Sequence, residues 1–161
     1  MTIRYALLSV MIAATPAAAQ GTLSPADQAA AFKAAGFKKL SGKWQGCGDP
    51  GSASYTPGAI ETVRDLNGDG RPEAVITEGS IACFGGDEVG YTIVSKQADQ
   101  SWKQITGGTG IVHVLATKGA GGWHDIEIGG QGFCFPVERW NGTAYALHRH
   151  QYEGKPCRPQ R

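Results

Sequence analysis

Short runs of β-forming residues, separated by glycine and other turn residues, fill the chain from Trp44 onward. The 161-residue sequence contains 24 glycines, about twice the share of ~7% that is usual in proteins. So many turn residues favour short strands over long helices. Eight runs are predicted as strands: residues 59–63, 74–77, 90–95, 102–106, 111–116, 125–128, 133–140 and 143–150.

The eight runs fall into two similar halves. Residues 70–76 resemble residues 122–128, and a Cys-Phe pair follows each segment. Each half holds four strands, as one blade of a β-propeller does, but two blades cannot close a ring. The sequence therefore predicts a mainly β fold of antiparallel meander sheets over about 44–151, with two blade-like four-stranded halves.

A short helix is predicted ahead of the strands, over residues 25–35. Ser24 is a favoured N-cap residue, Pro25 suits the first helical position, and Asp27 stands where a capping box carries its acid. Gly36 is a typical residue at a helix end. We expect this helix to pack against a sheet and to take no part in any chemistry.

The first 19 residues have the features of a secretory signal peptide. Arg4 gives a positive start, an apolar run covers residues 5–14, and small residues offer a cleavage site near Ala19. The apolar run is shorter than the ~20 residues that span a membrane, and no later run reaches that length. We therefore expect a single exported domain over residues 20–161, periplasmic or extracellular, with no membrane span.

The expected export affects the oxidation state of the four cysteines, which are Cys47, Cys83, Cys134 and Cys157. None belongs to a C-x-x-C pair, which disfavours zinc, and dispersed cysteines of even number favour disulfides in an oxidising compartment. Four cysteines allow three pairings. Neighbouring strands in a meander favour Cys47–Cys83 with Cys134–Cys157, which would tie down the C-terminal tail. The alternative, Cys83–Cys134 with Cys47–Cys157, would join the two halves.

The segment with the sequence DLNGDGRPE has the clearest chemical signal in the chain. Calcium binds ~6–8 oxygen ligands, which a tightly curled loop can supply. The alternating side chains of Asp65, Asn67 and Asp69 would point into such a loop. Arg71 can offer its backbone carbonyl, and Glu73 can complete the set directly or through water. The sequence therefore predicts a structural calcium site at these five residues.

This segment matches an EF-hand loop over its first six positions, but Ile76 stands where an EF-hand carries its bidentate glutamate. It is followed by a predicted strand. The segment instead resembles the calcium loop of FG-GAP and VCBS repeats, which more usually carry aspartate at the position of Glu73. The resemblance implies calcium ligands at Asp65, Asn67, Asp69, the Arg71 carbonyl and Glu73. A plain turn is the alternative, because Asn-Gly and Asp-Gly favour turns without any metal.

Histidines and tryptophans suggest two further hypotheses. His148 and His150 lie two residues apart on a predicted strand and could bind a metal ion together with His124. The tryptophans could form a surface on which sugars stack, although packing in the core is the main expectation for aromatic residues in a small β domain. The tryptophans are Trp44, Trp102, Trp123 and Trp140.

The net charge of +1 gives no reason to expect nucleic acid or an anionic membrane as the main partner. The whole chain resembles small exported proteins of proteobacteria, a resemblance that implies no activity. We expect a monomeric, non-enzymatic periplasmic or secreted module, stabilised by calcium and disulfides, that binds a protein or a glycan. Two alternatives stay open: a metal-dependent hydrolase that uses the histidines, and a protein inhibitor of cell-wall-degrading enzymes.

Overall fold

The computed structural model describes residues 21–48, 51–87 and 89–159. These residues form three antiparallel sheets and an N-terminal helix of 10 residues, so the predicted mainly β fold is confirmed. The predicted signal peptide lies outside the described residues. Within the described ranges, no helix has both the length and the apolar character needed to cross a membrane.

The order of the elements follows the predicted pattern of one helix and then many short strands. The helical segments are α1 (Pro25–Ala34), α2 (Ile81–Phe84) and the 3-10 turns η1 (Gly85–Asp87) and η2 (Ala120–Gly122). The strands are β1 (Lys38–Leu40), β2 (Lys43–Gln45), β3 (Thr56–Arg64), β4 (Glu73–Gly79), β5 (Val89–Lys96), β6 (Trp102–Thr109), β7 (Ile111–Lys118), β8 (His124–Gly129), β9 (Phe135–Trp140), β10 (Tyr145–Tyr152) and β11 (Lys155–Pro156).

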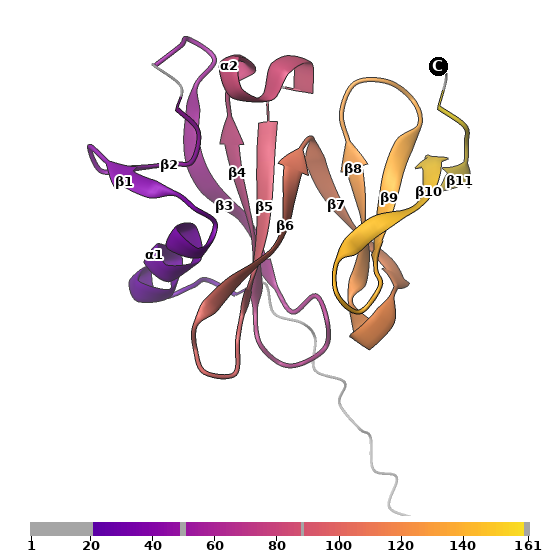
Figure 1. Cartoon of the computed structure of the whole chain (residues 1–161), viewed down its shortest axis with the longest axis horizontal. Helices are drawn as coiled ribbons and strands as arrows, with labels where there is room; N and C mark the ends of the chain where they lie inside the picture. The colour runs from indigo at the N-terminus through magenta and orange to yellow at the C-terminus, as the bar shows by residue number, and fades with distance from the viewer. Residues whose placement is uncertain (1–20, 49–50, 88, 160–161) are drawn as a thin grey trace, which may run out of the picture.

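Strands β3 to β6 form the first large sheet, and β7 to β11 form the second, each in the order of the sequence (Figure 1). All strand pairs in both sheets are antiparallel, so the two four-stranded meander halves are confirmed. Among the strands, two features were not predicted from the sequence. Strands β1 and β2 form a separate hairpin, and β11 adds a short strand at the edge of the second sheet.

One residue joins the two large sheets. Strand β6 ends at Thr109 and β7 begins at Ile111, so the chain passes from one sheet into the other at Gly110. Gly110 has a φ of 116°, a conformation that other residues rarely adopt. Its N–H donates to the Val89 carbonyl at 2.9 Å, and a Cβ on Gly110 would lie 2.5 Å from the Gly129 carbonyl oxygen. Both conformation and space therefore require glycine here.

Helix α1 begins as predicted and is tied to the first sheet by one carboxylate. The Ser24 hydroxyl accepts a hydrogen bond from the N–H of Asp27. The Asp27 carboxylate in turn pairs with the Lys96 ammonium at 2.9 Å and accepts a hydrogen bond from Nε1 of Trp102 at 3.2 Å. The hydrogen bonds from Lys96 and Trp102 lower the pKa of Asp27. One residue of the first helical turn therefore contacts both β5 and β6.

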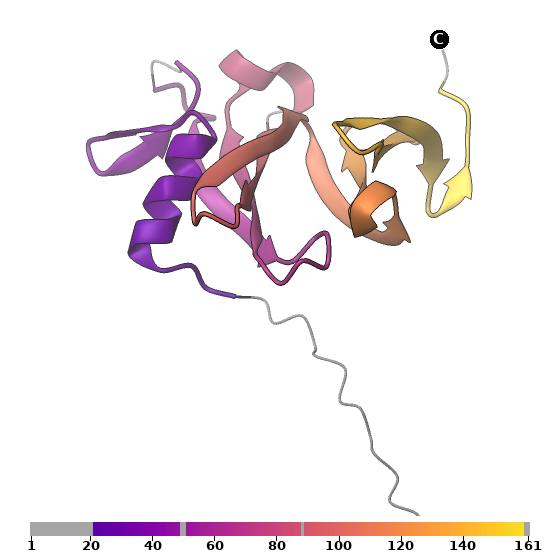
Figure 2. The ribbon, with the colours of Figure 1, turned by 60° about the horizontal axis from the view of Figure 1, so that its bottom comes forward.

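The first sheet buries apolar side chains on both faces. On one face, Ala74, Ile76 and Val94 pack against α1 and the β1–β2 hairpin. Figure 2 shows α1 lying across this face. Phe32 of α1 stacks on Trp44 of β2, with ring centroids 4.8 Å apart. The helix and the hairpin thus form one layer over the sheet.

The opposite face of the first sheet packs against the second sheet. Val75 of β4 and Ile93 of β5 belong to one buried cluster with Ile126 of β8. Leu66 and Trp123 complete this cluster from the loops at its end. Because successive side chains of a strand point to opposite faces, β4 contributes to two separate cores.

Two disulfides, Cys47–Cys83 and Cys134–Cys157, join the cysteines in the pairing that the meander favours. No cysteine in the part of the chain that the structure describes is free. The second disulfide links the segment before β9 to the end of the chain. This bond therefore ties the segment after β11 to the second sheet.

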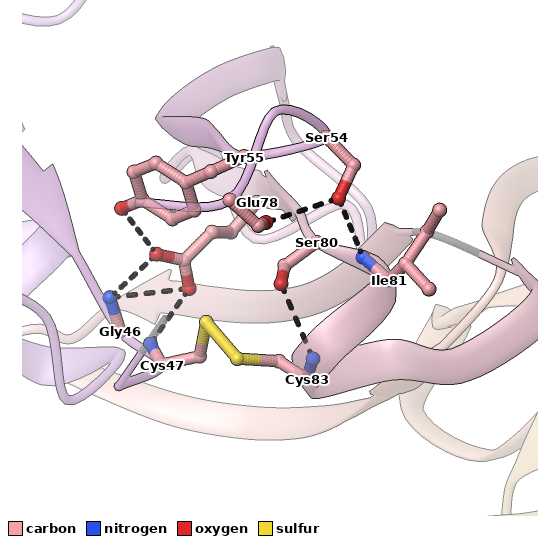
Figure 3. The surroundings of a disulfide bond; sticks show 9 residues. Gly46, Cys47, Ser54, Tyr55, Glu78, Ser80, Ile81 and Cys83 are labelled. Atoms are coloured by element: carbon pink, nitrogen blue, oxygen red, sulfur yellow. Dashed lines mark hydrogen bonds between the residues drawn. A yellow bond between two sulfur atoms is a disulfide. The ribbon is translucent and has the colours of Figure 1, made fainter. Parts of the chain in front are cut away.

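The first disulfide lies beside a buried carboxylate, that of Glu78 in β4 (Figure 3). The N–H groups of Gly46 and Cys47 donate to Glu78 at 2.8 to 3.1 Å, and the Tyr55 hydroxyl donates at 2.8 Å. These hydrogen bonds replace the water that a carboxylate loses on burial. The disulfide and Glu78 together hold the segment after β2 against the first sheet.

The variant Gly110→Ala is expected to lower the free energy of unfolding by about 2 kcal/mol or more, because it combines a strained backbone with a steric clash. Denaturant titration followed by circular dichroism measures this change. The matched control is Gly48→Ala, since Gly48 has no positive φ and an added Cβ meets nothing within 4 Å. The control is expected to change stability by less than about 0.5 kcal/mol. Equal stability of the two variants would contradict the role given to Gly110.

Candidate functional site

The acidic loop, residues 65–72, connects β3 to β4 and curls around the carboxylate of Asp65. The N–H groups of Asn67, Gly68 and Gly70 donate to this carboxylate at 2.6 to 3.1 Å. Burial opposes the charge of Asp65, but these hydrogen bonds outweigh it, and the pKa of Asp65 lies below its ordinary value. Gly68 and Gly70 have φ values of 83° and 80°, which permit the tight turn.

The next two polar side chains continue the same pattern. Oδ1 of Asn67 accepts from the N–H of Asp69, and Oδ1 of Asp69 accepts from the N–H of Arg71, both at 2.8 Å. The side chains of Asn67 and Arg71 also donate to Asp69. The loop is thus shaped by the alternating side chains of Asp65, Asn67 and Asp69. Their oxygens are metal ligands of the type that calcium prefers.

Glu73, the first residue of β4, has no exposed surface. Its Oε2 accepts from the Leu66 N–H at 2.6 Å, and its Oε1 accepts from the Ser95 hydroxyl at 2.7 Å. Burial raises the pKa of Glu73 to about 7, and the negative charges of Asp69 and Asp65 contribute to the rise. Glu73 therefore links the start of the acidic loop to β4 and β5 from the buried side.

The structure places the five predicted calcium ligands in two settings. Asp65, Asn67, Asp69 and Arg71 lie in the acidic loop, whereas Glu73 lies beneath it in contact with Leu66 and Ser95. Among the described residues, no three histidine, cysteine, aspartate or glutamate side chains lie close enough to hold a metal ion together. The predicted ligand atoms suit a hard cation such as calcium, because all of them are oxygens. In this structure the side-chain oxygens among these ligand atoms accept hydrogen bonds, as the plain-turn alternative also implies.

A groove of about 400 Å³ lies beside the acidic loop. Its walls come from the loop, from β5, β6 and the turn between them, from the residue before β8, and from the end of β9 and the turn after it. The loop contacts the second sheet directly, since the N–H of His124 donates to the Leu66 carbonyl at 2.8 Å. A Cβ on Gly122 would lie 2.5 Å from the carbonyl oxygen of Asn67. The groove is therefore formed where the two halves of the fold meet.

Two tryptophans line this groove. The ring centroids of Trp123 and Trp140 lie 5.2 Å apart, and the Tyr145 ring packs edge-on against Trp140 at 5.5 Å. The expectation that the tryptophans pack in the core is confirmed for Trp102 and Trp123, each 9% exposed. The alternative of a sugar-stacking surface concerns Trp140, which is half-buried and borders the groove.

The histidines that suggested a second metal site do not gather with a third ligand. His148 and His150 both lie on β10. His124 lies on β8, and its Nδ1 donates to the Leu115 carbonyl. Within the described ranges, these histidines belong to no group of three side chains that could hold a metal ion. The sequence-based hypothesis of a histidine cluster is therefore not supported by their positions.

Sequence reasoning missed a buried carboxylate in the second sheet, that of Asp125. Arg139 donates to both of its oxygens at 2.9 and 2.8 Å, Thr117 donates at 2.5 Å and Arg149 at 3.4 Å. Burial opposes the charge, but the hydrogen bonds from Arg139 and Thr117 and the charge of Arg139 outweigh it, so the pKa of Asp125 falls to about 2. The only sequence signal was an acid beside apolar Ile126 in a predicted strand.

In calcium-free buffer, stability is expected to fall by about 2 kcal/mol as the pH rises from about 5 to 7.5 because of Glu73. Folded Glu73 has a pKa of about 7 against an ordinary value of 4.5, so the folded state binds the proton more tightly. Its contribution is complete below the ordinary value and is lost as the pH passes through about 7. The variant Glu73→Gln keeps a neutral side chain of similar shape and flattens this dependence.

The measurement is a series of denaturant titrations across this pH range in EDTA. The readout is the difference between wild type and variant, in which the other titrating groups cancel. Glu61→Gln, on the exposed part of β3, is the control and is expected to keep the wild-type dependence. Identical pH dependence in Glu73→Gln and wild type would contradict the assignment of this effect to Glu73.

Comparison with known proteins identifies no relative. No protein-family model matches the chain, and no curated protein or solved structure matches it. What the protein does is therefore inferred from the acidic loop and the groove themselves.

Proposed function

We propose that the protein is an exported, non-enzymatic binding module whose acidic loop holds a structural calcium ion beside the binding groove. The observation that carries this proposal is the shared position of Asn67 and Asp69, which belong to the acidic loop and also line the groove. A cation held by the loop would fix one wall of the groove. The calcium ion would thus have a structural role, and the groove would bind the partner.

Calcium suits the loop for reasons of charge. Asp65, Asp69 and Glu73 place three carboxylates in one short segment, and among the described residues only Asp69 has an ion-pair partner, Arg71. A divalent cation offsets the repulsion between them and favours the ionised form of Glu73, whose pKa burial raises. The ion would be held by Asp65, Asn67, Asp69 and the Arg71 carbonyl, with Glu73 directly or through water.

Export is supported by the cysteines. All four form disulfides, Cys47–Cys83 and Cys134–Cys157. Disulfides persist in oxidising compartments and are rare in the cytosol. Together with the signal-peptide pattern of residues 1–19, the disulfides support a periplasmic or extracellular location.

A binding role is supported by the composition of the groove. Ligand sites combine apolar or aromatic walls with a few polar groups of fixed position. The groove pairs Trp123 and Trp140 with the polar side chains of the acidic loop, and Arg71 is held in place by its ion pair with Asp69. A protein or a glycan could therefore be recognised here without any chemical step.

Calcium is expected to raise the melting temperature of the mature protein, because a ligand that binds only the folded state stabilises it by mass action. At about 100 times the Kd the gain is about 2.7 kcal/mol, or about 5–10 °C for a domain of this size. Calorimetry with calcium added after treatment with EDTA measures the shift. Asp65→Ala and Asp69→Ala are each expected to abolish it.

The matched control is Asp99→Ala. Asp99 accepts hydrogen bonds from Ser101 in the β5–β6 turn and lies outside the acidic loop, so this variant is expected to keep the full calcium shift. Sodium chloride at equal ionic strength separates binding from general screening of charge. The absence of a shift in the wild type, or a full shift in both loop variants, would contradict the proposed calcium site.

A further inference from the structure

We infer that the groove beside the acidic loop binds an acidic saccharide, that is, a sugar ring bearing a carboxylate. This inference rests on the proposed role as a binding module and names the ligand class of that same groove. Three observations carry it: an aromatic wall, a lysine with no ion-pair partner among the described residues, and polar side chains whose positions are fixed by their own hydrogen bonds.

The half-buried ring of Trp140 can meet the face of a sugar ring, and the buried Trp123 packs against Trp140 and holds it in place. Trp123 and Trp140 lie with their centroids 5.2 Å apart and their planes inclined by 33°. The face of an indole ring carries negative potential, which attracts the C–H groups on one face of a pyranose. The groove volume of about 400 Å³ lies within the ~300–1,000 Å³ of small-ligand sites. A mono- or disaccharide is of a size that this space can hold.

The charges of the groove favour an anionic ligand. Arg71, Lys103 and Asp69 are the charged residues among those that line it. Arg71 is already engaged, because it pairs with Asp69 and its Nε donates to the Lys96 carbonyl at 3.1 Å. The Lys103 ammonium has no hydrogen bond or ion pair with any residue that the structure describes. A carboxylate on the ligand would complement this charge through a charge-assisted hydrogen bond.

Fixed polar side chains can recognise sugar hydroxyls. Nε2 of Gln97 donates to the Ser95 carbonyl at 3.0 Å, and the Thr143 hydroxyl donates to Oδ1 of Asn141 at 2.9 Å. Each side chain is thereby held in place and still has an oxygen with acceptor capacity. Both residues line the groove. The site thus offers acceptors to the hydroxyl groups of a sugar and a cation to its carboxylate.

Two larger grooves along β3 lack this combination. Their volumes are about 620 and 450 Å³, and both are lined by Glu61 and by no lysine or arginine. A carboxylate ligand would meet Glu61 there with no cation beside it to offset the repulsion, whereas Arg71 and Lys103 accompany Asp69 in the groove at the acidic loop. The groove at the acidic loop is therefore the better match for an acidic sugar.

The test is titration calorimetry with a galacturonic acid disaccharide and with the galactose disaccharide of the same linkage. The acidic sugar is expected to bind about tenfold more tightly or better, as one charge-assisted hydrogen bond implies. Lys103→Gln is expected to remove this preference, so that the acidic and the neutral sugar bind with similar affinity. Lys43→Gln, which changes an exposed lysine of β2 outside the groove, is the matched control and is expected to alter neither affinity.

Melting temperatures of each variant, with calcium and with EDTA, keep the two proposals separate. A calcium shift without binding of either sugar overturns the saccharide inference and leaves the calcium loop standing. Saccharide binding without any calcium shift overturns the calcium site and leaves the saccharide inference standing. Equal affinity for both sugars, or an undiminished preference in Lys103→Gln, overturns the role given to Lys103. Binding of an acidic peptide but of neither sugar overturns the ligand class.

Discussion

The alternation of side chains along β4 is the constraint on which the rest of the structure depends. Ala74 and Ile76 are buried against α1 and the β1–β2 hairpin, whereas Val75 is buried against the second sheet. A sheet with two apolar faces is stable only when both faces are covered. Helix α1 and the β1–β2 hairpin cover one face, and the second sheet covers the other. The two meander halves therefore depend on each other, although each resembles a separate blade.

The same packing places three carboxylates in the interior, and each is compensated differently. Asp125 is compensated by arginine, and Glu78 by backbone N–H groups and a tyrosine hydroxyl. Among the described residues, Glu73 has only the Leu66 N–H and the Ser95 hydroxyl as partners, and its pKa rises to about 7 as a result of burial. A buried charge without a cation is costly. The least compensated of the three lies directly beneath the acidic loop.

Local patterns in the sequence predicted the eight strands of the two meanders, the helix start and the disulfide pairing, because each depends on neighbours along the chain or in the meander. Tertiary contacts explain the misses. Strand β6 continues past its predicted end to Thr109 because glycine at 107 and 108 leaves room for Tyr91, whose ring lies 3.2 Å from a Cβ built on Gly108. The acidic loop could be predicted because its polar residues follow one another at a regular spacing. The groove could not be predicted, since Asn67, Lys103 and Trp140, which line it, are far apart in sequence.

The contact between the acidic loop and the second sheet links two sites that would otherwise be independent. The Leu66 carbonyl accepts from His124, and the Asn67 carbonyl lies against Gly122, next to Trp123. Anything that orders the loop therefore restricts a wall of the groove, and anything that fills the groove restricts the loop. Thermodynamic reciprocity requires each to change the affinity of the other by the same factor. Under the two proposals above, the affinity of the groove for its ligand would therefore depend on the calcium concentration.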